Sequence, residues 1–382
     1  MAFRTGRRFM IRAMAVIGTG LIGTSVALAV SRQGVTVFLS DRNPSAARTA
    51  AALGAGRVGL PVEPVDLAVL AVPPSQIGNV LTELQESGLA HYYTDVASVK
   101  AEPERVVLRR APDPSRYIGG HPMAGREWSG PLAARADLFH GRPWALTPSP
   151  LTASTALDRA LELVALCGGV PVVTQSQDHD DAVALTSHVP HLVASLMAAR
   201  LRDSPAEMRR FAGQGLRDVT RIARGDSRLW SDILQSNAPA IVGVVKDLHA
   251  DLSRLVSALD LLADPDAGEK AHGVRTMVDL LDRGIAGVNG IPGVRADAPA
   301  EDARVRVAVL DRPGELSRLL GAVVDHVPAE KADVDADDDK GLTVRFTVPP
   351  HVADRIAAEL RAGGWDAECE SAVHTGAPST GP

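Results

Sequence analysis

The sequence predicts three successive parts: an α/β domain with a doubly wound parallel sheet, an all-helical domain, and a small α+β domain. Short apolar runs alternate with segments of helical period up to residue 176. Strand candidates are then absent for roughly a hundred residues of helical period. Strand and helix patterns return after a segment rich in Gly, Pro and Ala. We therefore expect domains at 1–176, 177–290 and 303–372, a linker at 291–302, and a disordered tail at 373–382.

Length and composition agree with several globular domains. The chain has 382 residues, more than the roughly 250–300 at which a single core stops growing. Its net charge of −6 gives no reason to expect nucleic acid or an anionic membrane as partner. Cys167 and Cys369 lie far apart, which argues against disulfides and structural zinc. Paired arginines before the first apolar run imitate an export signal, but glycines interrupt that run, so we expect a cytoplasmic protein.

The first part supplies strands and helices in alternation. The strands are expected at 12–18, 35–41, 65–72, 92–100, 117–125, 143–150 and 170–174, the later ones with their exit loops. The helices between them are expected at 21–34, 44–55, 73–88 and 155–169. This alternation is typical of a parallel sheet with helices on its faces.

The remaining segments have different patterns. Residues 178–201, 206–225 and 228–262 have helical period almost throughout. Residues 304–326 show a strand, a tight turn and an amphipathic helix, and residues 342–370 show a strand, a helix and a strand. The last part is therefore expected to be a small module with the order βαββαβ.

The motif GTGLIG, residues 18–23, matches the Rossmann dinucleotide-binding fingerprint G-x-G-x-x-G. It follows a strand candidate, opens a helix and precedes Asp41 by about twenty residues, which is the context that makes this motif specific. The glycines permit the tight turn, the approach of a pyrophosphate and close packing of helix on strand. Asp41 favours NAD over NADP, although the adjacent Arg42 weakens that preference. The expected cofactor-binding residues are Gly18, Gly20, Leu21, Ile22, Gly23 and Asp41.

Two segments place reactive side chains at the carboxyl ends of strands, where an open sheet faces its ligand. Residues 94–100, TDVASVK, contain Ser98, and residues 119–130, GGHPMAGREWSG, place His121 in a turn made by two glycines and Pro122. An imidazole there can take a proton as a hydride leaves the same substrate carbon. The residues alone leave a solvated loop and a structural histidine as alternatives.

The helical part holds a second group of candidates. His188 and His191 are three residues apart and share one face of a helix, but no carboxylate completes a metal site and a proline interrupts the spacing, so no metal is expected. Arg221 is a candidate clamp for a carboxylate, because its planar fork binds one bidentately. The alternative is a surface arginine on a charged helix.

These motifs occur in an order that resembles the prephenate dehydrogenase family, over about residues 14–262. The segments concerned are GTGLIG, DVASVK, GGHPMAG, SHVPHL and RDVTRIA. The resemblance implies a Rossmann domain, a helical domain that forms a homodimer, and oxidative decarboxylation of prephenate by NAD to 4-hydroxyphenylpyruvate in tyrosine biosynthesis. Arogenate dehydrogenase is the alternative with the same chemistry, and a non-catalytic dinucleotide or amino-acid sensor is the alternative of another class.

The resemblance also implies individual roles. His121 would take the proton of the ring hydroxyl, with Ser98 helping to position it. Arg221 would bind a substrate carboxylate, while the remaining pocket residues would be His188, His191 and Trp230. The chain departs from the family pattern at Arg126, which follows HPMAG and could add a contact to substrate or cofactor.

The last part resembles an ACT domain, a small regulatory fold. The resemblance lies in VLDRPGELSRLL, with Asp311, Pro313 and Gly314 in its turn. It implies an amino-acid effector, for which tyrosine is the candidate. A structural or dimerising appendage is the alternative, and the acidic run KADVDADDDKG departs from an ordinary apolar strand.

Overall fold

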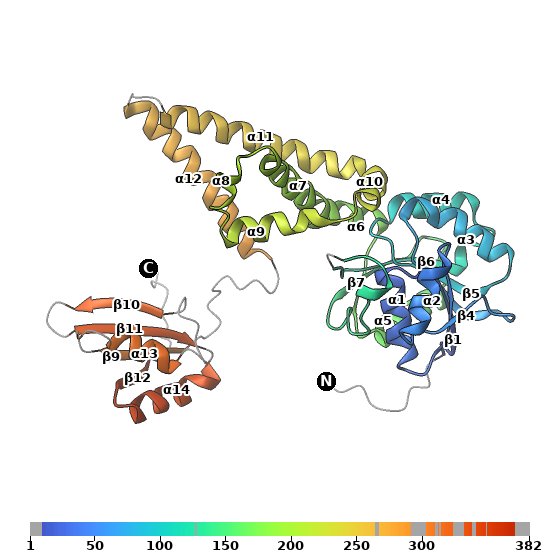
Figure 1. Ribbon diagram of the computed structural model, residues 1–382, viewed down its shortest axis with the longest axis horizontal. Helices are drawn as coiled ribbons and strands as arrows, with labels where there is room; N and C mark the ends of the chain where they lie inside the picture. The colour runs from blue at the N-terminus through green and yellow to red at the C-terminus, as the bar shows by residue number, and fades with distance from the viewer. Residues whose placement is uncertain are drawn as a thin grey trace, which may run out of the picture. The chain divides into compact units, whose positions relative to one another are not determined.

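The computed structural model describes residues 10–126, 128–263 and 267–291, and most of 303–370 apart from segments at 310–311, 313–314, 324–331, 338–340 and 349. The chain divides into two compact units, Met1–Val256 and Ser257–Pro382 (Figure 1). The expected disordered tail lies outside the described residues, as does the expected linker apart from Ile291. The expected turn with Asp311, Pro313 and Gly314 also lies outside them, apart from Arg312.

The first unit contains one eight-stranded sheet. Its strands are β1 (Ala13–Ile17), β2 (Thr36–Ser40), β3 (Arg57–Val58), β4 (Val65–Leu70), β5 (Ala90–Asp95), β6 (Tyr117–Pro122), β7 (Pro143–Thr147) and β8 (Val170–Val173). They lie in the order β3-β2-β1-β4-β5-β6-β7-β8. All neighbours from β3 to β6 are parallel, as are β7 and β8.

The sheet is parallel as expected except at one place. Strand β7 pairs with β6 in the antiparallel direction, with His121 opposite Ala145. A parallel pair needs a crossover connection, usually a helix, whereas the described residues between β6 and β7 contain a single 3-10 helix, Pro131–Ala133, and no α-helix. The chain therefore returns beside β6 in the opposite direction.

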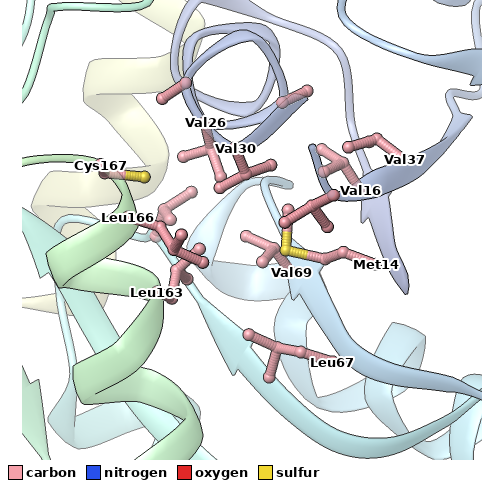
Figure 2. Close-up of a cluster of buried hydrophobic side chains, with 14 of the residues drawn as sticks. Met14, Val16, Val26, Val30, Val37, Leu67, Val69, Leu163, Leu166 and Cys167 are labelled. Carbon is pink, nitrogen blue, oxygen red and sulfur yellow. The ribbon is translucent and has the colours of Figure 1, made fainter. Parts of the chain in front are cut away.

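Helices cover both faces of the sheet. They are α1 (Leu21–Ser31), α2 (Pro44–Ala52), α3 (Ile77–Glu86), α4 (Ala101–Arg110) and α5 (Ser154–Leu166). One core joins α1 and α5 to the sheet, as Val26, Val30, Leu163 and Leu166 show against Val69 (Figure 2). The other core joins α3 and α4 to the opposite face. This two-sided burial explains why the central strands are apolar without alternation.

Local sequence explains where these helices begin. Asn43 caps α2 by accepting a hydrogen bond from the amide of Ser45, with Pro44 in the first helical position. Helix α4 has Glu102 and Glu104 in its first turn, where the positive end of the helix dipole favours carboxylates.

The helical part of the first unit begins directly after β8. Its helices are α6 (Ser176–Val183), α7 (Val189–Arg202), α8 (Ala206–Arg209), α9 (Gln214–Arg221), α10 (Ser227–Ser236) and α11 (Ala238–Ala263), the last of which continues into the second unit. A π-helical turn, Ala184–His188, joins α6 to α7. Pro190 follows in the next turn and has no amide hydrogen to donate to the regular helical hydrogen bond. Because one regular bond is missing there, the helix tolerates a wider turn.

The continuous helix 176–202 is long and apolar enough to cross a membrane by length and hydropathy. Core helices of globular proteins pass the same test. This helix buries the polar side chains of His179, Asp180 and His188.

The second unit contains α12 (Ala267–Asn289) and a four-stranded module. The module consists of β9 (Ala303–Val309), α13 (Glu315–Val323), β10 (Ala332–Asp337), β11 (Gly341–Val348), α14 (Pro350–Ala362) and β12 (Asp366–Glu370). Its sheet has the order β10-β11-β9-β12, with every pair antiparallel (Figure 1). Strands and helices thus follow one another as βαββαβ, and both helices pack on one core.

Candidate active site

The glycine-rich turn between β1 and α1 has the geometry of a dinucleotide-binding loop. Gly18 adopts φ +99°, and a Cβ there would overlap the carbonyl of Ala71. A Cβ on Gly23 would overlap the carbonyl of Gly18, whereas one on Gly20 would enter open space. No side chain caps α1 at Gly20 and its first turn holds no acidic residue. The helix N-terminus is therefore shaped for an anion to approach the backbone.

Asp41 lies at the carboxyl end of β2, next to this turn. Its Oδ2 accepts hydrogen bonds from the Thr19 amide, at 2.6 Å, and the Thr19 hydroxyl, at 2.9 Å. The carboxylate is thus held beside the turn, where the residues present fit the diphosphate and ribose of NAD. Leu21 and Ile22 are half-buried and pack against the core, so that part of each residue remains accessible beside the turn.

His121 lies within β6 and not in a turn after it, so the expectation of a turn is wrong. Pairing with β7 extends the strand through Pro122. The two preceding glycines serve close packing and not chain reversal. A Cβ on Gly119 would overlap the Thr147 hydroxyl, and one on Gly120 would lie 2.7 Å from the carbonyl oxygen of Asp95.

His121 begins a chain of buried polar groups. Its Nδ1 lies 2.9 Å from Nε2 of His179, and Nδ1 of His179 lies 2.7 Å from Oδ1 of Asp180. Asp180 also accepts hydrogen bonds from the main-chain amides of Lys100, at 2.8 Å, and Ala101, at 2.9 Å. His179 and Asp180 are almost fully buried, while His121 is half-buried.

A second buried network lies beneath His121. The Lys100 ammonium forms an ion pair with Asp95 and donates to the carbonyl of Gly120, at 2.7 Å. Asp95 also accepts from the Tyr117 hydroxyl and, at 2.7 Å, from the amide of Ala97. This network joins the ends of β5 and β6, and so fixes the backbone that carries His121.

The environment keeps the imidazoles of His121 and His188 neutral. Burial lowers the pKa of His121 well below its usual 6.5, and the neighbouring His179, Lys100 and His188 lower it further. Burial also lowers the pKa of His188 to about 4. For Lys100, burial lowers the pKa more than the ion pair with Asp95 raises it. A neutral His121 can accept a proton.

His188 and His191 both contact Trp230. The His191 ring stacks on the indole at 3.6 Å between centroids, and the His188 ring meets it edge-on at 6.1 Å. Nδ1 of His188 lies 3.2 Å from the side-chain amide of Asn237. Gly225 has no Cβ, which leaves room for the indole. No cluster of three or more potential metal ligands occurs among the described residues.

An open pocket of about 580 Å³ lies beside this stack. Arg126, Arg221 and Arg224 line it together with Trp128, and its remaining described lining residues are Gly125, His191, Ile222, Gly225 and Trp230. Acidic side chains are absent from the described lining. Three guanidinium groups around one pocket favour an anionic ligand.

Ser98 lies half-buried after β5, near the Asp95 network. Within the described part of the chain, no hydrogen bond joins Ser98 to His121. The structure therefore brings Arg126, Arg221, His191 and Trp230 into one pocket, but does not place Ser98 in contact with the base.

Sequence reasoning missed His179, Asp180 and Asn237 as site residues. The segment SQDHDDAV has the appearance of a solvated helix start, because acidic residues are common there. The available indication was the dipeptide of His179 and Asp180 just before an apolar helix.

Comparisons with known proteins agree with this geometry. A family model described as the nucleotide-binding domain of prephenate dehydrogenase matches residues 26–173, and one described as its dimerization domain matches residues 175–269. A probable prephenate dehydrogenase of Streptomyces niveus is 42% identical over 362 residues, which cover 94% of this chain and 99% of the relative.

Two solved structures are similar over most of the chain. Prephenate dehydrogenase of Aquifex aeolicus, in complex with hydroxyphenyl propionate and NAD+, is 25% identical with a TM-score of 0.62, covering 73% of this chain and 100% of that one. Arogenate dehydrogenase of Synechocystis is 26% identical with a TM-score of 0.57, covering 72% and 99%.

Proposed function

Because this chain belongs to the prephenate dehydrogenase family, we propose that the site described above carries out that family's reaction. The protein is an NAD-dependent oxidoreductase that converts prephenate to 4-hydroxyphenylpyruvate with loss of carbon dioxide. The observation that carries this proposal is a neutral, half-buried His121 on the strand that follows the dinucleotide-binding half of the sheet.

The chain's residues have to orient the substrate and accept one proton. NAD, which the glycine-rich turn and Asp41 would hold, would supply the hydride acceptor for the ring carbon that carries the hydroxyl. His121 takes the hydroxyl proton on its Nε2, because its Nδ1 is engaged by His179. Loss of carbon dioxide yields an aromatic ring, so that the protein needs mainly to position the reacting groups. Ser98, in the loop after β5, would contact the substrate hydroxyl.

The arginine-lined pocket supports prephenate over arogenate as substrate. Arg126, Arg221 and Arg224 would bind the side-chain carboxylate, with His191 and Trp230 forming the pocket wall and His188 behind them. Arogenate carries an ammonium group where prephenate carries a keto oxygen. Three guanidinium groups repel that cation, whereas they attract the keto oxygen and the carboxylate.

The test is the formation of reduced nicotinamide by the purified protein with prephenate or arogenate, under NAD or NADP. Turnover with prephenate and NAD is expected, and a His121→Asn variant should lose it by about 10²–10⁴-fold, the range for a general base. Preference for arogenate would overturn the substrate assignment, and turnover by neither substrate would overturn the enzyme.

The helical part supports a homodimer. Its helices α7 and α11 expose apolar side chains in the first unit, including Leu196, Met197, Leu248 and Leu252. Monomeric proteins rarely leave such rows uncovered. A second copy of the chain is the proposed partner, and sedimentation should show twice the mass of one chain. Neither nucleic acid nor a membrane is proposed as a partner, and the proposed compartment is the cytoplasm.

The module 303–372 is proposed to be an ACT-like regulatory domain that binds tyrosine. Its βαββαβ order and antiparallel sheet support the fold assignment. Tyrosine should lower turnover in the full chain, and titration calorimetry should detect its binding. Heat changes indistinguishable from buffer, with unchanged turnover, would leave the module as a structural appendage.

A further inference from the structure

We propose that Asp180 and His179 act as a relay that fixes the tautomer of His121 and receives its proton. This inference rests on the proposed function only for the identity of the substrate. The relay comprises two residues on α6, the first helix after the sheet. Hydrogen bonds link Asp180 to His179 and His179 to the base His121 on β6.

The hydrogen-bond partners of Asp180 determine which nitrogen atoms of the relay carry protons. Main-chain amides can only donate, and those of Lys100 and Ala101 point at Oδ1 and Oδ2 of Asp180. Oδ1 also faces Nδ1 of His179 at 2.7 Å. Asp180 therefore acts as an acceptor, and Nδ1 of His179 carries the proton.

The tautomer of His179 then determines that of His121. A neutral imidazole with its proton on Nδ1 has a lone pair on Nε2. That lone pair lies 2.9 Å from Nδ1 of His121, which must donate. The remaining nitrogen of His121, Nε2, is left with a lone pair. This is the tautomer that can accept a proton from a substrate hydroxyl.

The proton steps balance without a further reactant. The substrate O–H bond breaks as an N–H bond forms at Nε2 of His121. The N–H bond at Nδ1 of His121 breaks as one forms at Nε2 of His179, and the Asp180 carboxylate stabilises the resulting imidazolium. The excess proton returns through His121 to water after product leaves.

The charges around the relay favour proton transfer from His121 to His179. Burial lowers the pKa of His121, and the neighbouring His179, Lys100 and His188 lower it further, so a proton held on His121 is disfavoured. Asp180 is the carboxylate in direct contact with an imidazole of the relay, and it touches His179 and not His121. Asp95 is paired with Lys100 beneath the strand. The carboxylate that can stabilise the transferred proton therefore lies beside His179 and not beside His121.

Four variants separate the relay from a structural role. Asp180→Asn replaces one acceptor oxygen by an amide group, so one of the groups that donate to Asp180 loses its acceptor. His179→Leu removes both functions of the imidazole. His179→Gln can still accept from His121 and donate to Asp180, but it cannot take a proton. Asp181→Asn is the matched control, because Asp181 is exposed on the same helix and its side chain accepts a hydrogen bond from Gln177.

The first readout needs no substrate. Nitrogen-15 NMR of labelled histidines reports which ring nitrogen carries the proton. We expect His121 with its proton on Nδ1 in the wild type, the Asp181→Asn control and His179→Gln. We expect a shift of that proton to Nε2, or a mixture of tautomers, in Asp180→Asn and His179→Leu. An unchanged His121 tautomer in both folded variants would overturn the relay.

The second readout is kinetic. For Asp180→Asn and His179→Leu, kcat should fall about 100-fold or more with KM changed less than about threefold, because the loss concerns the transition state. The kcat of His179→Gln should fall less than that of these two variants. As the pH is lowered, the kcat of His179→Gln should fall further below that of the wild type, because the variant has no second group to take the proton from His121. The control should stay within about twofold.

The outcomes remain separable from failure of the proposed function. If the wild type oxidises neither prephenate nor arogenate, the function is wrong, while the NMR tautomers still test the relay. Because Asp180 also caps the first amides of α4, Asp180→Asn could fail to fold. The two His179 variants retain that cap and then decide the question alone. Equal kcat for wild type, His179→Leu and His179→Gln would overturn the proposal.

Discussion

Replacing Lys100 by methionine should destabilise the first unit strongly. Lys100 is 1% exposed and its partner Asp95 is fully buried. The variant would leave the Asp95 carboxylate with the Tyr117 hydroxyl and the Ala97 amide, and the carbonyl of Gly120 without its lysine donor. Removing one member of a buried ion pair costs about 3–5 kcal/mol, because the other charge stays buried.

That magnitude is large against the roughly 5–15 kcal/mol by which domains are usually stable. Urea unfolding, followed by the fluorescence of the buried Trp144, would measure it. The double variant Lys100→Met with Asp95→Asn removes the remaining charge as well, so it should lose about 2 kcal/mol less than the single variant. A single variant within about 1 kcal/mol of wild type would refute the reasoning, since the pair would then contribute no more than a surface one.

Three further predictions concern cofactor and base. Burial and His179 hold the pKa of His121 well below 6.5, so kcat/KM should stay constant from neutral pH down to 6.5 and decrease only below it; a decline beginning near neutrality would contradict this. Gly20→Ala should weaken NAD binding about tenfold, measured by calorimetry, without unfolding the protein, whereas Gly23→Ala, which overlaps a carbonyl, should lower the melting temperature. Asp41→Asn should raise the ratio of NADP to NAD turnover about tenfold, because a carboxylate no longer repels the 2′-phosphate.

The dinucleotide-binding half could be predicted well from the sequence. Period and turn chemistry are local properties, and Gly18, Gly20 and Gly23 each have the environment that the motif implies. The direction of β7 could not be predicted, because an apolar strand pattern carries no direction. The absence of a helical pattern between β6 and β7 was the one available indication.

The candidate site could be predicted only in part. Arg221, His191 and Trp230 form one pocket as expected from their motif, whereas His179 and Asp180 were overlooked. Acidic and basic residues are almost never fully buried unless paired, so a sequence pattern assigns them to the surface by default. Only the packing of a helix against the ends of β5 and β6 reveals that they are inside.

The bonds made by Asp180 also bear on how ligands enter and leave. Its carboxylate holds the amides of Lys100 and Ala101, and its carbonyl accepts from Asn237 at the start of α11. Separating the helical part from the sheet would break both buried bonds to the Lys100 and Ala101 amides at once, while the bond to Asn237 anchors Asp180 within the helical part. We therefore expect no hinge at this junction, and expect substrate exchange through the rim that carries Arg126 and Trp128.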